Sequence, residues 1–314
     1  MMYNIDTNDM RGYYMSKVVV IGGTNIDIFA YPHQRIVMKD SNPGYISTSL
    51  GGVGRNISEN LARLGLDVTL ITVLGRDEAA NWVKAESKKI GLKLSIVEVD
   101  QTPSYIAIFD EFHEDLVSVA AMDQLASLDA DEILKRKKII NDAEIIVMDT
   151  NLSFETMDVI FDQFKQKIFV DAISSQKAIK IKPYLSKIFG LKLNIIEAEL
   201  LTGITYETME DLNKMGDMLL ERGVKEVFIT LGDKGAYYTN LREAIFRNAI
   251  PVKIKNSTGA GDAFFAGAIY AKLLDKNPLS YAMANAVLNL SDEKSVCASL
   301  TKEILEETVK ELSL

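Results

Sequence analysis

The sequence predicts an α/β fold with a mainly parallel central sheet, helices on both faces of that sheet, and a small second sheet placed as a lid. The large sheet is predicted by short β-branched runs that alternate along the chain with segments of helical periodicity. The lid is predicted by residues 31–50 and 92–122, where short alternating strands pair with one another. A chain of 314 residues fits one large domain, which we place at 16–314, with residues 1–15 as a flexible N-terminal extension.

The first elements set up both sheets. A strand at residues 17–21 (KVVVI) ends at a Gly-Gly pair, and it opens into a loop at the edge where ligands collect in α/β sheets. Residues 31–50 are polar and interrupted by an Asn-Pro-Gly turn, which predicts hairpin or irregular structure away from the main sheet. A helix is expected from 53 to 64, because apolar residues recur there at helical spacing.

Strands and helices alternate in the remainder of the chain. The expected strands of the large sheet are the apolar runs DVTLITVLG, EIIVMD, KIFVDA, LKLNII and EVFIT. The expected strands of the lid are centred on SIVEV, SYIAIFD and LVSVAAM. Helices are expected at 78–90, between the later strands and up to residue 222, and three more helices follow a glycine-rich hairpin.

Composition excludes several classes of protein. The chain has 47% hydrophobic and 25% charged residues, as soluble globular proteins do. A net charge of −9 without clustered Lys and Arg argues against a nucleic-acid-binding protein, because phosphate neutralisation needs grouped cations. The single cysteine, Cys297, cannot form an intrachain disulfide, which suits a reducing compartment. No apolar run approaches the roughly 20 residues that span a bilayer and no signal peptide is evident, so we expect a cytoplasmic protein without membrane contact.

The segment NSTGAGDAFFAGA at residues 256–268 gives the strongest functional signal. A glycine-rich turn passes directly into an apolar run, which predicts the N-terminus of a buried helix. Unpaired N–H groups at such an end bind anions, and Gly259, Ala260 and Gly261 leave room for a phosphate and form the expected anion hole. Asp262 would repel that phosphate unless it accepts a proton from an attacking hydroxyl, so we predict that it is a catalytic base. The alternative is that Asp262 only caps the helix.

A second glycine-rich segment, GGVGRN, precedes the helix expected from residue 53, and it matches neither a dinucleotide fingerprint nor a P-loop. Gly51 and Gly52 allow the backbone to approach a small polar ligand, and the Asn56 amide suits a hydroxyl. Asn25 and Asp27, just after the first strand, add side-chain oxygens that can accept hydrogen bonds from hydroxyl groups on the same side of the sheet. Taken alone, the GGVGRN segment is more often an ordinary turn, and Asp27 is equally consistent with a solvated loop in which it caps a helix.

Two later strand ends indicate a nucleotide. Asn194 and Glu197 lie at the end of the strand LKLNII, where Glu197 suits water-coordinated Mg²⁺ and Asn194 a phosphate oxygen. Thr230 and Gly232 end the strand EVFIT in a glycine turn that lets a flat base, a ribose or a phosphate lie against the backbone. Taken alone, the first signal is weak, and the second is equally consistent with a simple hairpin.

Together these motifs resemble the ribokinase family of carbohydrate and nucleoside kinases, the PfkB type. GGTNID, GGVGRN, N-x-x-E, T-x-G-x-x-G and NSTGAGDAFFAG occur in the family's order and approximate spacing over about residues 17–312. The resemblance implies a ribokinase-like three-layer α/β/α sandwich with a small β lid, and ATP and Mg²⁺ as cofactors. The implied site consists of the base Asp262, acceptor contacts Asn25, Asp27, Gly51, Gly52 and Asn56, ATP contacts Asn194, Thr230, Gly232, Thr258 and Asn285, and the metal contact Glu197.

Within the family, residues 41–65 and 289–303 are most similar to the pseudouridine kinases. The reaction implied is transfer of the ATP γ-phosphate to the ribose 5′-hydroxyl of pseudouridine. Ribose, another nucleoside or a ketose such as fructose are the alternative acceptors, and a non-catalytic ligand-binding protein is the alternative of another class. Relatives often carry Asp where this chain has Asn256, so the need for a monovalent cation stays open. Pairing of lids is a common route to dimers in the family, which makes a homodimer the assembly to test.

Overall fold

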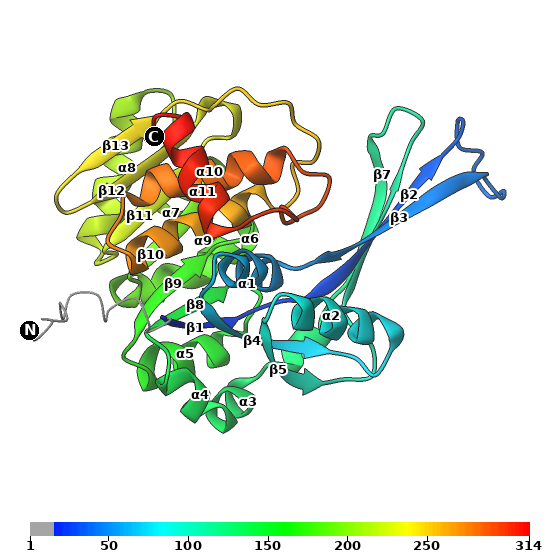
Figure 1. The fold of residues 1–314 in the computed structure, drawn as a ribbon, viewed down its shortest axis with the longest axis horizontal. Coiled ribbons are helices and arrows are strands. Elements are labelled where there is room, and N and C mark those ends of the chain that lie inside the picture. Colours follow the sequence, from blue (N-terminus) through cyan, green and yellow to red (C-terminus); the bar gives the residue numbers. More distant parts are fainter. Residues whose placement is uncertain (1–15) are drawn as a thin grey trace, which may run out of the picture.

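The computed structural model describes residues 16–314 (Figure 1), and the predicted N-terminal extension lies outside the described residues. Its centre is a nine-stranded sheet with the order β13-β12-β11-β10-β9-β8-β1-β4-β5. The parallel strands are β1 (Lys17–Ile21), β4 (Asp67–Leu74), β5 (Lys93–Glu98), β8 (Ile145–Asp149), β9 (Lys167–Asp171), β10 (Gly190–Asn194) and β11 (Glu226–Thr230). At one end of the sheet, β12 (Ala236–Asn240) pairs antiparallel with β11, and the edge strand β13 (Ala244–Arg247) pairs antiparallel with β12. The mainly parallel sheet is therefore confirmed.

Helices cover both faces of this sheet because alternate side chains of each buried strand point to opposite sides. On β1, Val18 and Val20 belong to one apolar core, and Val19 and Ile21 belong to the other. The first core is closed by α1 (Val53–Arg63), α9 (Ala260–Leu273), α10 (Pro278–Leu290) and α11 (Lys302–Glu311). The second is closed by α3 (Ala130–Lys135), α4 (Lys137–Asn141), α5 (Phe154–Gln163), α6 (Ser175–Ala178), η3 (Ile179–Lys187), α7 (Ile195–Thr202) and α8 (Met209–Glu221). The fold is the predicted three-layer sandwich.

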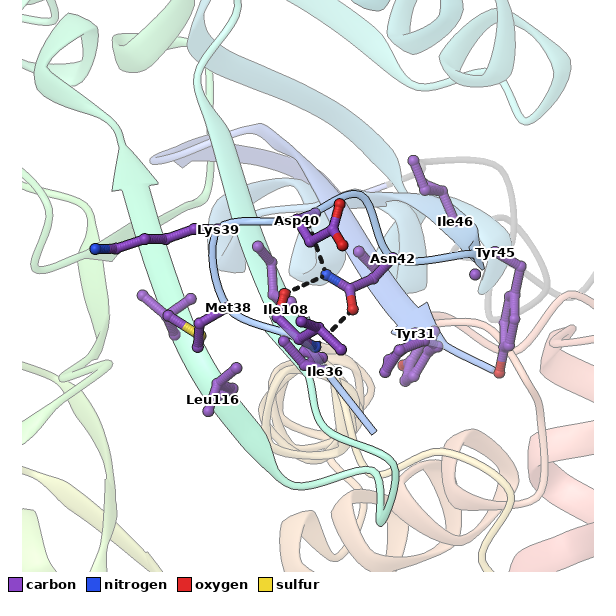
Figure 2. Close-up of a pocket in the computed structure, with 15 residues that line it drawn as sticks. Tyr31, Ile36, Met38, Lys39, Asp40, Asn42, Tyr45, Ile46, Ile108 and Leu116 are labelled. Carbon is purple, nitrogen blue, oxygen red and sulfur yellow. Dashed lines mark hydrogen bonds between the residues drawn. The ribbon is translucent and has the colours of Figure 1, made fainter. Parts of the chain in front are cut away.

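A four-stranded second sheet, which we call the lid, projects from the main body (Figure 1). Its strand order is β3-β2-β6-β7, from β2 (Asn25–Pro32), β3 (Gly44–Gly51), β6 (Ser104–Phe109) and β7 (Asp115–Ala121). β2 and β3 form an antiparallel hairpin, and β6 pairs in parallel with β2. At the hairpin tip, the Asn42 side chain bonds the backbone N–H and carbonyl of Val37 at 2.7 and 3.0 Å (Figure 2), which holds the predicted turn.

The predicted boundaries of the lid were wrong at two places. The strand expected around SIVEV is β5, which pairs in parallel with β4 in the large sheet. The crossover helix α2 (Glu78–Lys89) explains this, because a helix between two strands brings the second one alongside the first in parallel. The lid also begins at Asn25 instead of residue 31, since β2 follows β1 after only three residues.

The base of the lid is fixed to the main body by a small apolar cluster. Ile26 of β2 and Leu50 of β3 pack with Leu74, Ala80 and Val83 from β4 and α2. The inner ends of β2 and β3, which contain the predicted acceptor contacts, are thereby held against the large sheet. Within residues 16–314, no helix combines the length and the apolar character needed to cross a membrane.

Candidate active site

The candidate site lies at the carboxyl edge of the large sheet, next to β1. The chain order of the strands reverses there, since β4 lies on one side of β1 and β8 on the other, and such switch points form ligand crevices. Asp149 and Asp171 end β8 and β9 at this edge, and both are buried. Asp149 Oδ2 accepts a 2.8 Å hydrogen bond from the Gly23 N–H, so it fixes the loop that follows β1.

On the lid side of the crevice, three predicted acceptor residues, Asn25, Asp27 and Gly51, lie next to one another. Asn25 lies opposite Gly51, and Asn25 Nδ2 donates to Asp27 Oδ1 at 2.6 Å. A Cβ atom at Gly51 would lie 2.3 Å from Asp27 Oδ2, so only glycine leaves this carboxylate oxygen open. Gly52 has φ 98°, and a Cβ there would lie 2.4 Å from the Gly23 carbonyl oxygen. Burial raises the pKa of Asp27, and the Asn25 hydrogen bond partly opposes that shift.

Asn56 on α1 links the lid side to the predicted base. Arg55 Nη1 donates to Asn56 Oδ1 at 2.8 Å, and Asn56 Nδ2 donates to Asp262 Oδ2 at 2.7 Å. Because Arg55 occupies the amide oxygen, the amide must present its NH₂ group to Asp262. Arg55 also pairs with Glu59 and donates to the Leu50 carbonyl at 2.7 Å. Burial lowers the pKa of Arg55 to about 10, which still leaves it cationic at neutral pH.

The anion hole was predicted at the N-terminus of α9. The N-cap of this helix is Gly259, so no side chain caps the first turn, and the Ala260 N–H makes only a long 3.4 Å contact to the Ser257 carbonyl. Such a helix start suits an anion. Gly259 has φ 79°, and a Cβ there would lie 2.0 Å from the Ser295 carbonyl oxygen. The helix start thus packs directly against Ser295, whose hydroxyl donates to the Leu50 carbonyl at 2.9 Å. Glycine is required at residue 259 for both reasons.

Asp262 lies in the third position of α9, and its protonation depends on its neighbours. Its carboxylate is almost fully buried. Burial and the nearby Asp171 carboxylate raise the pKa of Asp262 to about 7, and the Lys192 ammonium and the Asn56 hydrogen bond act in the opposite direction. A carboxyl group that titrates near neutral pH suits general base catalysis.

Lys192, a buried residue of β10, brings a cation to the same point. Its Nζ lies 3.1 Å from Asp171 Oδ2 and 3.0 Å from where a Cβ at Gly261 would be. The ammonium group is therefore beside the N-terminus of α9. Burial alone lowers the pKa of Lys192, but the carboxylates of Asp171, Asp262 and Glu197 outweigh burial and raise it, so this residue stays charged.

Asn194 and Glu197 lie at the next strand end and bond mainly to each other. Asn194 caps α7, and its Oδ1 accepts from the Glu197 N–H at 2.9 Å. Glu197 Oε2 and Oε1 accept from the Asn194 N–H and Nδ2, both at 2.8 Å. Burial raises the pKa of Glu197, which is fully buried. The sequence pattern N-x-x-E is thus a capping box at the carboxyl edge of the sheet.

Three predicted ATP contacts lie along accessible parts of this edge. Thr230 ends β11 and is in register with Asn194. Gly232 follows it with φ 62°, and nothing lies within 4 Å of where its Cβ would be. Thr258 is exposed just before α9, and its N–H donates to Asn256 Oδ1 at 2.9 Å. These residues leave an open backbone surface next to the anion hole.

Asn285 is not at the surface of the site, which corrects its assignment as an ATP contact. It is fully buried in α10, and its Nδ2 donates to Asn60 Oδ1 at 3.0 Å and to the Ala263 carbonyl at 2.7 Å. Its amide therefore joins α10 to α1 and α9. A nucleotide at the carboxyl edge of the sheet has no access to a side chain enclosed by three helices.

Four residues of the site were missed from the sequence, namely Arg55, Asp149, Asp171 and Lys192. Three of them had a recognisable signal. Asp149 and Asp171 each end an apolar strand, where a carboxylate reaches the ligand edge of a parallel sheet. Lys192 interrupts the buried run LKLN, and a buried lysine needs a partner. Arg55 had no such signal, because an arginine in the first turn of a helix is usually exposed.

Comparisons with known proteins indicate the family of this chain. The profile of the pfkB family of carbohydrate kinases matches residues 15–289. A pseudouridine kinase of Escherichia coli is 35% identical over 255 residues, which cover 80% of this chain and 82% of that protein. A guanosine-inosine kinase of Exiguobacterium acetylicum is 26% identical and covers 81% of this chain and 87% of its own length.

A solved structure gives the same architecture. A protein described as a sugar kinase from Clostridium perfringens superposes with a TM-score of 0.85 and 30% identity, covering 94% of this chain and 96% of that one. The ribokinase of Arabidopsis thaliana complexed with ribose and ATP superposes with a TM-score of 0.80 at 21% identity, over 95% of this chain and 99% of that one. The second likeness is evidence for the fold alone.

Proposed function

Because the chain belongs to the pfkB family of carbohydrate kinases, enzymes that transfer phosphate to a hydroxyl acceptor, we propose that it transfers the ATP γ-phosphate to the ribose 5′-hydroxyl of pseudouridine. Membership in the family confirms the resemblance found in the sequence motifs. One observation supports the chemistry above all: Asp262 is a buried carboxylate with a pKa of about 7 at an anion-binding helix start. The 35% identity to the E. coli pseudouridine kinase supports the choice of acceptor.

In this proposal the lid side of the crevice binds the sugar. Asp27 and Asn25 bind the vicinal 2′- and 3′-hydroxyls, because a carboxylate accepts two hydrogen bonds and Gly51 leaves its Oδ2 open. Gly52 lets the backbone approach the ring closely. The sugar then lies between Asp27 and Asp262, with the 5′-hydroxyl directed toward the second carboxylate.

Asp262 accepts the proton of the 5′-hydroxyl as that oxygen attacks the γ-phosphorus atom. The Asn56 amide, oriented by Arg55, holds Asp262 Oδ2 and leaves Oδ1 for the hydroxyl. Bond formation to the 5′-oxygen and loss of ADP balance the transfer, and the proton stays on the carboxylate until the product leaves. Fixing the base through two hydrogen-bonded neighbours lowers the entropic cost of alignment.

The phosphate side is formed by α9 and β10. Gly259, Ala260 and Gly261 direct N–H groups at the γ-phosphate, and Lys192 places an ammonium beside them to stabilise the charge that develops during transfer. The rest of ATP extends along the open edge formed by Asn194, Thr230, Gly232 and Thr258.

Mg²⁺ fits the chemistry of this edge. Three carboxylates, those of Asp171, Glu197 and Asp262, act on a single buried ammonium, that of Lys192. Their excess negative charge would repel a triphosphate unless a cation accompanied it. Asp171 Oδ2 has the Lys192 ammonium 3.1 Å away and accepts no other contact from residues 16–314, so its second lone pair suits a metal-bound water. In the same residues no three His, Cys, Asp or Glu side chains are arranged to hold a metal ion by themselves, so phosphate oxygens and waters would complete the coordination, with Glu197 and Asp171 behind them. When bound, Mg²⁺ supplies charge neutralisation on the phosphates.

A monovalent cation is left out of the proposal. Asn256 replaces the aspartate that relatives often carry, and its amide is already engaged on both sides. Its Nδ2 donates to the Glu293 carbonyl at 3.0 Å, and its Oδ1 accepts from Thr258. A neutral, satisfied amide gives a cation little to bind.

The acceptor is tested with a panel of substrates. Pseudouridine, uridine, inosine, guanosine, ribose and fructose would each be incubated with ATP and Mg²⁺, and ADP release measured by a coupled assay. We expect the highest kcat/KM for pseudouridine. A clear preference for ribose or fructose would overturn the choice of acceptor while keeping the kinase, and the Asp262→Asn protein, purified in parallel, controls for contaminating kinases.

We also propose that two copies pair through their lids. The lid face opposite Asp27 exposes Ile46, Ile108, Val117 and Val119, the first to 68% and the last to 58%. Figure 2 shows a pocket of about 440 Å³ next to this face, lined largely by apolar side chains that include Ile36, Met38 and Leu116. Aliphatic side chains on a projecting sheet favour burial against a second such sheet.

A further inference from the structure

The lid carries a row of aromatic side chains on the same face as Asp27. Side chains alternate between the two faces of a strand, so Phe29 shares the face of Asp27 on β2. On β6, Tyr105 lies in register with Asp27 and therefore shares that face as well. The ring of Phe29 meets Tyr105 edge to face, with centroids 6.5 Å apart, and meets Phe109 at 5.8 Å on its outer side.

The geometry of a furanose directs its C1′ substituent toward this row. C4′, which bears C5′, and C1′ flank the ring oxygen on opposite sides, so the C1′ substituent extends away from the 5′-hydroxyl. If the 5′-hydroxyl is at Asp262 and the diol at Asp27, that substituent points away from α9 and along the lid. β2 runs outward from the main body in this direction (Figure 1), and Phe29 is the next residue of β2 on that face after Asp27.

The surroundings of Phe29 suit a flat ring with a polar edge. Phe29 and Tyr105 are only half-buried, so part of each ring remains accessible. Their planes are 79° apart, so the two rings meet edge to face and do not stack on each other. Across the hairpin, Ser47 lies opposite Phe29 and Ser49 opposite Asp27, and these small side chains leave space and supply hydroxyls for hydrogen bonds. A free sugar would leave the aromatic surface unfilled.

We propose that Phe29 and Tyr105 form a subsite for a planar aromatic base carried at C1′ of the acceptor. The subsite rests on the proposed function, because it uses the sugar orientation assigned there. It implies that the phosphate acceptors are nucleosides. Phe29 provides the stacking surface, and Tyr105 contacts the edge of the base. Stacking of a base on an aromatic side chain corresponds to about tenfold in affinity or more.

The test compares acceptors that differ only at C1′. Pseudouridine carries a planar base at C1′, and methyl β-ribofuranoside carries a methoxy group at C1′ of the same furanose ring, which cannot open. We would measure kcat/KM for both with the wild-type protein, Phe29→Leu and Tyr105→Leu. The control is Tyr45→Leu, since the Tyr45 ring stacks on Tyr31 farther out on the lid, with centroids 5.0 Å apart. Thermal melting of each variant checks that the lid still folds.

We expect Phe29→Leu to lower the ratio of kcat/KM for pseudouridine to that for the methyl riboside by about tenfold, mainly through KM. Tyr105→Leu should lower the ratio several-fold, and Tyr45→Leu should leave it unchanged. If pseudouridine is phosphorylated but neither Phe29→Leu nor Tyr105→Leu changes the ratio, the subsite is refuted while the proposed function stands. If the wild-type protein phosphorylates the methyl riboside or ribose but no nucleoside, the proposed acceptor and the subsite both fall.

Discussion

Replacing Lys192 by Met should shift the pH dependence of the reaction upward. Asp262 can accept a proton only when it is deprotonated, so kcat/KM should rise with pH through the pKa of about 7 in the free enzyme. Lys192 lowers that pKa by stabilising the carboxylate, and Asp171 raises it by repulsion. Removing the cation therefore raises the pKa of Asp262 and moves the rising limb of the profile to higher pH.

The size of the effect follows from how close these groups are. An opposite charge within ~4–6 Å changes the pKa of a carboxyl group by about 1–3 units, and Lys192 Nζ lies beside the first turn of α9. With a shift of one unit, from about 7 to about 8, the deprotonated fraction at pH 7 falls from about one half to about one tenth. The part of the loss in kcat/KM that comes from protonation of Asp262 is then about fivefold at pH 7 and nearly absent at pH 9, in addition to a loss that is equal at every pH because the charge beside the phosphate is missing.

The assay is kcat/KM for pseudouridine against pH, from ADP release with coupling enzymes in excess at every pH. Asp171→Asn is the opposing variant, because it removes the repulsion and should move the limb to lower pH. The double variant Lys192→Met/Asp171→Asn should return the limb close to its wild-type position. It also avoids leaving Asp171 as a buried charge without a partner, which can cost about 3–5 kcal/mol of stability.

A loss that is equal at all pH values in Lys192→Met would refute this reasoning. It would mean that the ammonium acts on the phosphate alone and has no influence on the base. Parallel shifts of the same sign in Lys192→Met and Asp171→Asn would refute the charge assignment as well.

Three other predictions follow from the site and the lid. Asp262→Asn keeps the shape of the base but removes its proton affinity, so kcat should fall at least about a hundredfold while nucleotide binding by calorimetry persists; near-normal turnover would contradict its role. Gly259→Ala should lower the free energy of unfolding in urea by more than about 2 kcal/mol, because φ at residue 259 is 79° and the new Cβ would collide with the Ser295 carbonyl. Gly91→Ala is the control, since φ there is 72° but the space is open, and it should lower the free energy of unfolding by only about 1 kcal/mol. Equal losses in the two variants would show that the contact with Ser295 is irrelevant. Val119→Glu should convert a dimer to a monomer in light scattering, and an unchanged mass, or a monomeric wild-type protein, would rule out pairing through this face.

The sequence was sufficient for the large sheet and for the place of Asp262 in the first turn of a buried helix, because these depend on local signals. Apolar runs bounded by turn residues predict buried strands, and a glycine-rich turn before an apolar run predicts the start of a buried helix. The strand around SIVEV was assigned to the wrong sheet, because its alternation is the same whether it joins β4 or β6. Only the crossover of α2, a feature of topology, decides between them.

Side chains whose roles depend on distant partners were the ones missed or misassigned. The role of Lys192 depends on its contact with Asp171, which is 21 residues away in the sequence, and on the charge of Asp262 in α9. Asn285 was expected at the nucleotide, but Asn60 and Ala263 enclose it within the helical layer. Such pairings are set by how helices pack on the sheet, and a single sequence contains no direct record of them.

The backbone carbonyl oxygen of Leu50 connects the lid to two other parts of the candidate site. It accepts hydrogen bonds from Arg55, which orients the amide beside the base, and from Ser295, against which the start of α9 packs. One backbone oxygen in β3 thus connects the lid to Asn56 through Arg55 and to the start of α9 through Ser295. Under the proposed function, a movement of the lid that displaced Leu50 would therefore shift the acceptor side and the phosphate side of the site together.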